Sequence, residues 1–221
     1  MTQVENSDNK AAFMGRVTAS VTHEIQNVLA IIKETSGLME DFFLLQKSGD
    51  PQNIEEKLDT CIKTIKKQTY RGVNLTSGLN VFAHTADSSH VSINIFETIT
   101  KMIFITKRLF IQKGVDVSIV ECSKPYSLNT DPVLFQMAVF SCIECLIDNF
   151  VTKASITLSI QSIDNRTAIQ FLYNDDTLTY EDYSQKIVPG DQWTKITLLC
   201  EQISLTAEVA ADSPAILIFF K

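Results

Sequence analysis

The chain has 221 residues, enough for one large or two small domains, and its 45% hydrophobic and 20% charged residues are typical of an ordinary globular protein. The net charge of −7 disfavours nucleic-acid binding, and five cysteines without framework spacing favour a reducing compartment over a disulfide scaffold. No apolar run reaches the roughly 20 residues that cross a bilayer, and the polar N-terminus is unlike a signal peptide, so we expect a cytoplasmic protein outside the membrane.

The first fifty residues predict one long amphipathic helix. Residues 1 to about 10 are polar, and we expect them to be disordered. From there to about residue 45, apolar residues recur at steps of three, four or seven, as in a helix with a near-heptad seam. The residues of this seam are Met14, Val17, Val21, Ile25, Val28, Ile32, Met39 and Phe42. The turn cluster at 47–51 ends the helix.

A second apolar stripe predicts a second long helix. Its residues are Ile54, Leu58, Ile62, Ile65, Thr69, Val73, Thr76, Leu79 and Ala83. Two long helices joined by a short turn form an antiparallel hairpin, and such a hairpin cannot bury its seams alone. We expect a homodimer in which two hairpins form a four-helix bundle. The alternative is that the C-terminal half of the same chain covers the seam.

The helical pattern stops at small polar residues near residue 88, which predicts two domains, 1–88 and 89–221. The second domain reads as helices alternating with strands, which predicts an α+β fold with helices on one face of a mixed sheet. We expect helices at 94–111, 132–150 and 192–205, strands at 116–121, 126–129, 155–161, 167–173 and 215–220, and an irregular acidic segment after residue 173. Asp131 is expected to cap the helix that Pro132 opens, and Gly114 to close the helix before it.

His23 is the candidate reactive residue of the first helix. It lies two residues past Val21, about 200° round the helix from the seam, so its imidazole should face water or a partner. Glu24 follows at once, and Asn27 lies one turn later. A solvated surface histidine without a role is the plain alternative.

The stretch from Ser20 to Ile31, Ser-Val-Thr-His-Glu-Ile-Gln-Asn-Val-Leu-Ala-Ile, resembles the phospho-acceptor box of two-component sensor histidine kinases. The family has a His-Glu pair followed by a hydrophobic residue, a polar residue, and Asn or Thr. The sequence departs from the family at Val28, where proline is usual. The order of the later elements resembles the family's ATP-binding domain, which implies an α/β sandwich after the hairpin.

The second domain lacks the nucleotide-binding residues of that family. Asp131-Pro132 resembles the start of the magnesium-binding helix, but the metal-binding Asn position carries Cys145. Tyr173 stands at the position of the Asp that reads adenine, and the runs 173–177 and 192–196 lack the glycines of the two later motifs. A phosphate-binding loop favours glycine because its backbone amides must approach phosphate closely. We therefore expect no ATP cofactor and a degenerate nucleotide domain.

These features lead to the hypothesis of a dimeric histidine phosphotransferase of a phosphorelay. His23 would carry a phosphoryl group between the aspartates of response-regulator receiver domains, and the receiver would supply magnesium. Glu24 would fix the tautomer of the ring, and Asn27 would bind phosphoryl oxygens or orient a water molecule. The residues expected near His23 on the docking surface are Ser20, Gln26, Ala30 and Lys33.

Three alternatives stay open at this point: a sensor histidine kinase with a divergent ATP site, a non-catalytic or phosphatase-like protein that binds receivers, and a plain coiled-coil dimerisation module. We expect no metal site. Cys142 and Cys145 form a Cys-x-x-Cys pair, but they lie in an apolar helix without a second ligand pair, so we expect two buried, inert thiols.

Overall fold

The computed structural model of the chain describes residues 3–47, 53–122, 124–150, 155–163, 165–174, 180–211 and 213–220. These residues form two compact units. One consists of residues 1–15 together with 82–221, and the other of residues 16–81. The predicted division into domains 1–88 and 89–221 stays a prediction.

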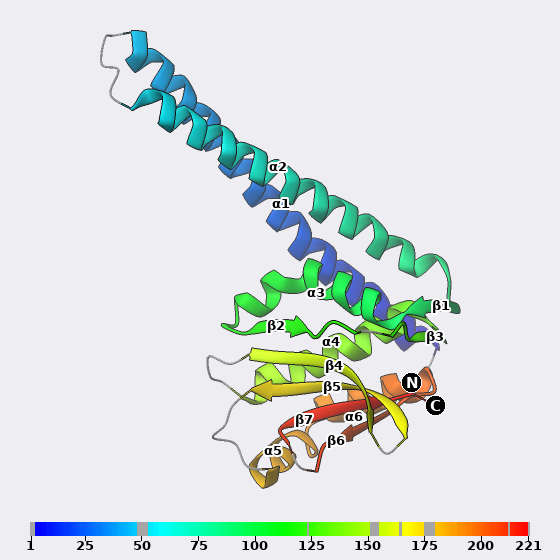
Figure 1. Ribbon diagram of the computed structural model, residues 1–221. Helices are drawn as coiled ribbons and strands as arrows, with labels where there is room; N and C mark the ends of the chain where they lie inside the picture. The colour runs from blue at the N-terminus through cyan, green and yellow to red at the C-terminus, as the bar shows by residue number, and fades with distance from the viewer. Residues whose placement is uncertain are drawn as a thin grey trace. The chain divides into compact units, whose positions relative to one another are not determined.

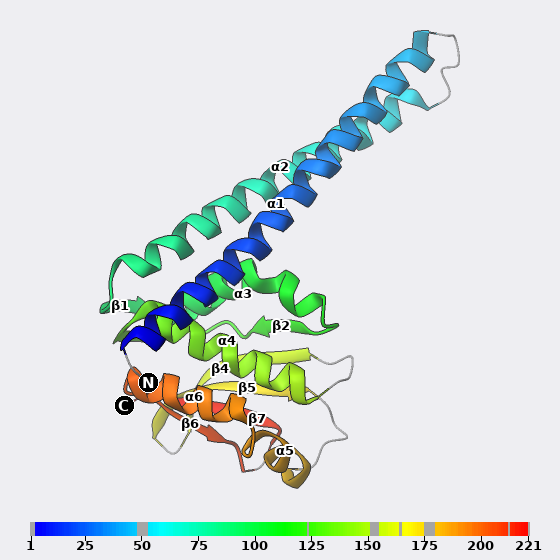
Figure 2. The same cartoon turned by 180° about the vertical axis from the view of Figure 1, so that it is seen from behind.

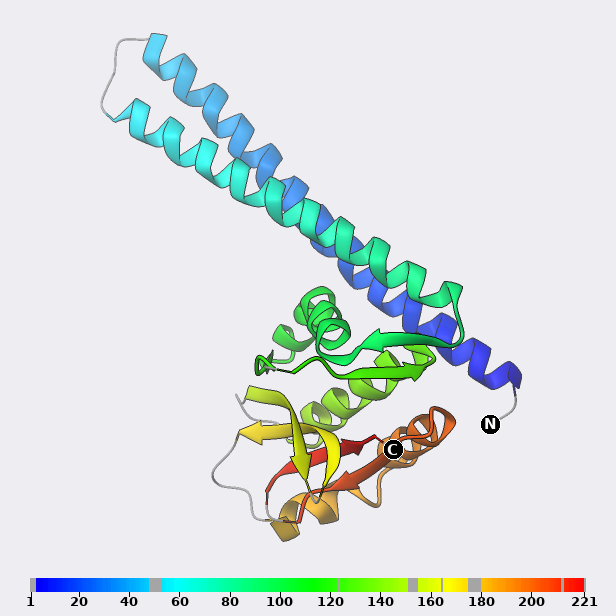
Figure 3. The same ribbon diagram turned by 45° about the vertical axis from the view of Figure 1, so that its right-hand side comes forward.

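The unit 16–81 is a helical hairpin, as the apolar stripes predict. It is built from α1 (Gln3–Lys47) and α2 (Ile54–His84), which run side by side (Figure 3). The hairpin's buried apolar side chains are Val17, Val21, Val28, Ile54, Cys61 and Leu75. The predicted turn at 47–51 falls almost entirely on residues that are not described.

The start of α1 differs from the prediction. The helix begins at Gln3, so the expectation of disorder up to residue 10 is wrong from residue 3 onward. Farther along the helix, Phe13 packs within the larger unit against Phe82 and Phe140, with ring centroids 5.8 and 5.4 Å away. Lys10 adds an ion pair to Asp131 at 2.5 Å. Phe13 is thus the side chain by which this part of α1 enters the core of the larger unit, and Lys10 adds a polar contact.

The larger unit contains two sheets (Figure 1). A small antiparallel sheet pairs β1 (Val91–Asn94) with β3 (Ser127–Thr130). The main sheet has five strands in the order β2-β4-β5-β7-β6, with β2 parallel to β4 and the other pairs antiparallel. The strands of this sheet are β2 (Asp116–Ile119), β4 (Ser155–Ile163), β5 (Arg166–Asn174), β6 (Thr206–Val209) and β7 (Ala215–Phe219).

Four α-helices are described in this unit besides the start of α1: α3 (Ile95–Ile111), α4 (Pro132–Asn149), α5 (Tyr180–Ile187) and α6 (Asp191–Gln202). A single 3₁₀ turn, η1 (Thr85–Asp87), follows α2. Both α4 and α6 lie on one face of the main sheet, behind it in Figure 1 and in front of it in Figure 2. The α+β class, with a hairpin followed by helices on one face of a mixed sheet, is confirmed.

Helix α4 is the central element of this core. The Asp131 side chain caps it by accepting hydrogen bonds from the backbone amides of Val133 and Leu134, both at 3.0 Å, as predicted. By length and composition α4 is the one helix among the described residues that qualifies as a membrane span. However, 78% of that span is buried inside the fold, which is the pattern of a core helix.

The register of β4 and β5 places one row of large side chains against the helices. Ile156 lies opposite Tyr173, and Leu158 opposite Phe171. All four side chains are fully buried. Tyr173 therefore belongs to the core face of the sheet, because side chains two residues apart on a strand share a face.

Candidate functional site

His23 lies on the exposed side of α1, between the buried seam residues Val21 and Val28. Its ring has no hydrogen-bond partner among the described residues. The sequence argument about the helix face is therefore confirmed. An accessible imidazole without an internal partner is able to meet a group brought by another molecule.

Glu24 faces the neighbouring helix. Its Oε1 accepts a hydrogen bond from Nη2 of Arg71 on α2, and the two side chains form an ion pair. Its Oε2 accepts a longer hydrogen bond, 3.4 Å, from Nδ2 of Asn27. The expected contact in which Glu24 fixes the tautomer of the His23 ring is thus not present among the described residues, and the carboxylate is engaged by Arg71 and Asn27 instead.

Arg71 is the residue of this site that sequence reasoning missed. It lies 47 positions after Glu24, and the register of the two helices decides which residues meet. Gly72, its neighbour, lets the helices approach: a Cβ at this position would lie 3.3 Å from Cγ1 of Val28. The sequence shows an arginine in the second helix and a carboxylate in the motif of the first. Such a pair of charges is too common to identify Arg71 as part of the site.

The four residues expected on the docking surface differ in exposure. Gln26, Ala30 and Lys33 are exposed. Ser20 is buried, with 9% of its surface exposed, and its Oγ has no hydrogen-bond partner in the structure described. The docking role of these residues stays a prediction, and for Ser20 it would require the hydroxyl to become accessible.

Aromatic side chains fill the place where the resemblance to kinases puts the adenine-reading Asp. Tyr173, at that position, is fully buried, and its hydroxyl donates a 2.8 Å hydrogen bond to the carbonyl oxygen of Phe150. The Phe150 ring lies 5.2 Å from Tyr173 and stacks on Tyr183 at 4.9 Å, with 7° between the planes. Both tyrosines are fully buried, so this cluster is packed core.

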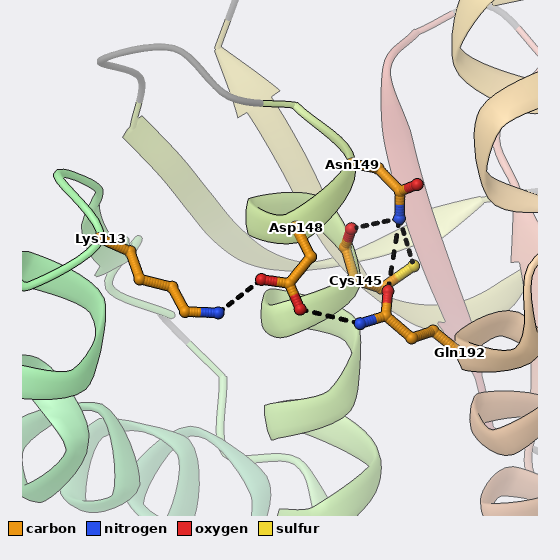
Figure 4. Close-up of polar contacts among 5 residues, drawn as sticks. All are labelled: Lys113, Cys145, Asp148, Asn149 and Gln192. Carbon is orange, nitrogen blue, oxygen red and sulfur yellow. Dashed lines mark hydrogen bonds and ion pairs between the residues drawn. The ribbon is translucent and has the colours of Figure 1, made fainter.

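The end of α4 carries an internal polar network instead of a metal-binding amide (Figure 4). Cys145 stands at the position of the family's metal-binding Asn, and the Asn149 amide donates to its carbonyl oxygen at 2.8 Å. The same amide lies 3.4 Å from Oε1 of Gln192. The Gln192 amide donates to Asp148 at 2.8 Å, and Asp148 pairs with Lys113 at 2.5 Å. These contacts fasten α6 to α4 and engage Asn149.

The glycines give no phosphate-binding loop in the described part of the chain. Gly114 is the described glycine with a positive φ, 77°, and it follows α3, as predicted for a helix end. Gly190 precedes α6 with a φ of −83°, which any residue adopts. Residues 175–177 of the other expected motif lie outside the described residues. The expectation of no ATP cofactor stays a prediction, and the buried aromatic cluster around Phe150 is the observation that bears on it.

Cys142, Cys145 and Cys200 of the larger unit are buried. Burial raises the pKa of the Cys145 thiol to about 11 and that of Cys200 to about 12, and it also raises the pKa of Cys142. We call Cys142, Cys145 and Cys200 the buried thiols. The expectation that the Cys-x-x-Cys pair is buried is confirmed. No group of three or more metal-binding side chains suited to an ion is present within the described ranges.

No known family model matches this sequence, and none of the curated proteins matches it. Similar solved structures include the histidine kinase ThkA in complex with the response regulator protein TrrA, with 13% identity, a TM-score of 0.46, and coverage of 96% of this chain and 62% of the other. The Acinetobacter baumannii histidine kinase AdeS has 10% identity, a TM-score of 0.45, and coverage of 89% and 95%. A bacterial phosphotransferase has 12% identity, a TM-score of 0.44, and coverage of 95% and 96%. The similarity is one of general fold.

Proposed function

We propose that the protein is a histidine phosphotransferase of a phosphorelay, which passes a phosphoryl group between response-regulator receiver domains through His23. The observation that carries this proposal is an exposed, unpartnered imidazole beside Glu24 and Asn27 on a helical hairpin. The packed aromatic core of the larger unit supports the proposal that the phosphoryl group comes from another protein and not from ATP. We place the protein in the cytoplasm, where receivers act.

The transfer needs little from the acceptor protein. The ring nitrogen of His23 that carries the lone pair attacks phosphorus, the bond from phosphorus to the receiver's aspartate oxygen breaks, and the aspartate leaves as a carboxylate. The proton on the other ring nitrogen is retained or lost to solvent. A neutral imidazole is a good nucleophile near pH 7, and catalysis is mostly in-line positioning. Magnesium, bound by the receiver, would offset charge on the phosphoryl oxygens.

The proposal includes a homodimer. Ile25, Leu29 and Ile32 form a stripe along α1 at helical spacing, and none of them is fully buried by the hairpin. Ile62 and Val73 continue an apolar stripe on α2, with 41% and 56% of their surfaces exposed. A second copy would cover these side chains in a four-helix bundle, because each hairpin presents the same stripe.

The experiment that tests the function uses receiver domains of the source organism, labelled on aspartate with radioactive acetyl phosphate. Each is mixed with the wild-type protein and with His23→Gln, and the two proteins are separated on a neutral gel. Acid-labile label on the wild-type chain, absent from His23→Gln, is the expected result. A complete set of receivers that leaves the wild-type chain unlabelled contradicts the proposal.

The kinase alternative makes a different prediction in the same gel. A histidine kinase with a divergent ATP site labels His23 from radioactive ATP and magnesium without any receiver. We expect no label under this condition, because the adenine-reading position is occupied by the buried Tyr173 ring.

A further inference from the structure

We propose that Arg71 is a positioning residue of the His23 site, which holds the Glu24 carboxylate and, through it, the Asn27 amide on the α2 side of the phosphoryl-accepting histidine. This inference rests on the proposed function. It assigns a role to a residue of α2, whereas the sequence motif lies wholly within α1.

The contacts of Glu24 are the first observation. Arg71 binds one carboxylate oxygen across the hairpin, and Asn27 binds the other. With both oxygens engaged in this way, Glu24 is directed toward α2. The His23 ring is consequently left without an internal hydrogen bond in the described structure and is accessible to a partner.

The burial of this pair is the second observation. The Glu24 side chain is 15% exposed and the Arg71 side chain 46%, whereas the pair Lys63–Asp59 on the same hairpin is 75% and 56% exposed. A partly buried pair is screened less by salt and water than an exposed pair. The Arg71 contact is therefore better suited than an ordinary surface ion pair to fix the position of a side chain.

The local approach of the two helices is the third observation. Gly72 follows Arg71, and its missing Cβ leaves room for Val28, one turn beyond Glu24 on α1. Close approach at this level shortens the span that the arginine side chain must bridge. The ion pair is thus supported by the packing next to it.

The charge of the phosphorylated state gives Arg71 a consequence for the reaction. A phosphoryl group on His23 carries nearly two negative charges, and the adjacent residue is a carboxylate. A carboxylate about 6 Å from a doubly charged group disfavours the phosphorylated state by roughly tenfold in water-like surroundings. Arg71 offsets this repulsion by pairing with Glu24. It acts through Glu24 and need not touch the phosphoryl group.

The test measures the equilibrium of phosphoryl exchange between His23 and a labelled receiver that phosphorylates the wild-type protein. Arg71→Ala is expected to lower the fraction of phosphorylated His23, with an equilibrium constant about tenfold below wild type. Arg71→Lys is expected to restore most of it. Lys67→Ala removes the same charge from an exposed site one turn earlier on α2 and is expected to behave as wild type. Circular dichroism confirms that each variant retains its helices.

A double-mutant cycle identifies the route of the effect. In the Glu24→Gln background, Arg71→Ala is expected to have a much smaller effect, because Arg71 has no carboxylate left to hold and a free, exposed guanidinium is screened by solvent. Additive effects of the two substitutions overturn the inference, and so does an Arg71→Ala variant that matches Lys67→Ala. Weaker binding of the unphosphorylated receiver to Arg71→Ala also overturns it, because Arg71 would then contact the receiver directly.

The wild-type result separates this inference from the proposed function. If no receiver labels wild-type His23, the proposed function fails, and the role of Arg71 in it fails as well. If wild-type His23 is labelled and Arg71→Ala is labelled equally, the function stands and the inference alone fails.

Discussion

Tyr173 offers a quantitative test of the packed aromatic core around Phe150. Tyr173→Phe removes only the hydroxyl that donates to the Phe150 carbonyl, and it should cost about 1–2 kcal/mol of unfolding free energy. Tyr173→Asn also removes a fully buried ring in contact with Phe150, so its cost should be about 3–5 kcal/mol. Tyr173→Asp introduces a buried carboxylate and should cost several kcal/mol more than Asn at neutral pH.

The pH dependence separates the charge from the cavity. A carboxylate buried at this position would have its folded-state pKa raised above the unfolded value of about 3.9. The protonated form then adds stability that is present below about pH 4 and is lost as the pH rises. Tyr173→Asp should therefore approach Tyr173→Asn in acid and fall below it at pH 7.

The free energy of unfolding of the wild type and the three Tyr173 variants can be measured by urea unfolding. The fluorescence of Trp193, the only tryptophan of the chain, reports the transition. Phe104→Asp is the matched control, because Phe104 lies in the same unit with 43% of its surface exposed, and it should cost about 1 kcal/mol or less. Equal stability of Tyr173→Asp and Tyr173→Asn at pH 7, together with ATP binding by the Asp variant, would refute the packed-core reasoning.

The remaining predictions concern the start of α1, the thiols and the dimer. Phe13→Ala should destabilise the larger unit by about 3–5 kcal/mol in the same urea assay, because it empties a site between Phe82 and Phe140; an unchanged midpoint would mean that the start of α1 is not part of this core. In the native protein at pH 8, iodoacetamide should modify the partly exposed Cys122 first and spare the buried thiols, as mass spectrometry would detect. Burial raises the pKa of those thiols, so above about pH 8.5 the unfolded chain loses their protons while the folded chain keeps them. The free energy of unfolding should therefore decrease as the pH rises above about 8.5. An increase in this range would contradict the burial of the thiols. Leu29→Glu should convert the dimer to a monomer in analytical ultracentrifugation, because it places a charge in the proposed bundle; dimers of this variant would exclude that interface.

Periodic patterns in the sequence predicted the larger elements well. The two long stripes locate α1 and α2, and Asp131-Pro132 locates the start of α4. Such signals are local, because a cap or a repeat of apolar residues determines a helix without knowledge of its partners. The exposed position of His23 follows from the same helical geometry.

Shorter elements escaped prediction because tertiary contacts define them. Strands β1 and β6 have four residues each and exist through pairing with β3 and β7. Helix α5 lies within the acidic segment that we expected to be irregular, so that expectation is wrong there, and its Tyr183 is held by the stack on Phe150. No local pattern indicates these pairings.

The site was predicted in part for the same reason. His23, Glu24 and Asn27 are neighbours on one helix, so their proximity follows from the sequence. The contact of Glu24 with Arg71 depends on the register between helices, which the length and shape of the connection determine. The pairing of Glu24 with Arg71 could therefore not be predicted from the sequence.

The most direct measurement of the central claim is the site and source of phosphorylation on one protein sample. The chain is incubated either with magnesium and ATP or with a phosphorylated receiver, and mass spectrometry at neutral pH locates the phosphoryl group. The proposed function predicts phosphorylation of His23 by the receiver and none by ATP. Phosphorylation of His23 by ATP alone, or of a residue other than His23 by the receiver, would contradict it.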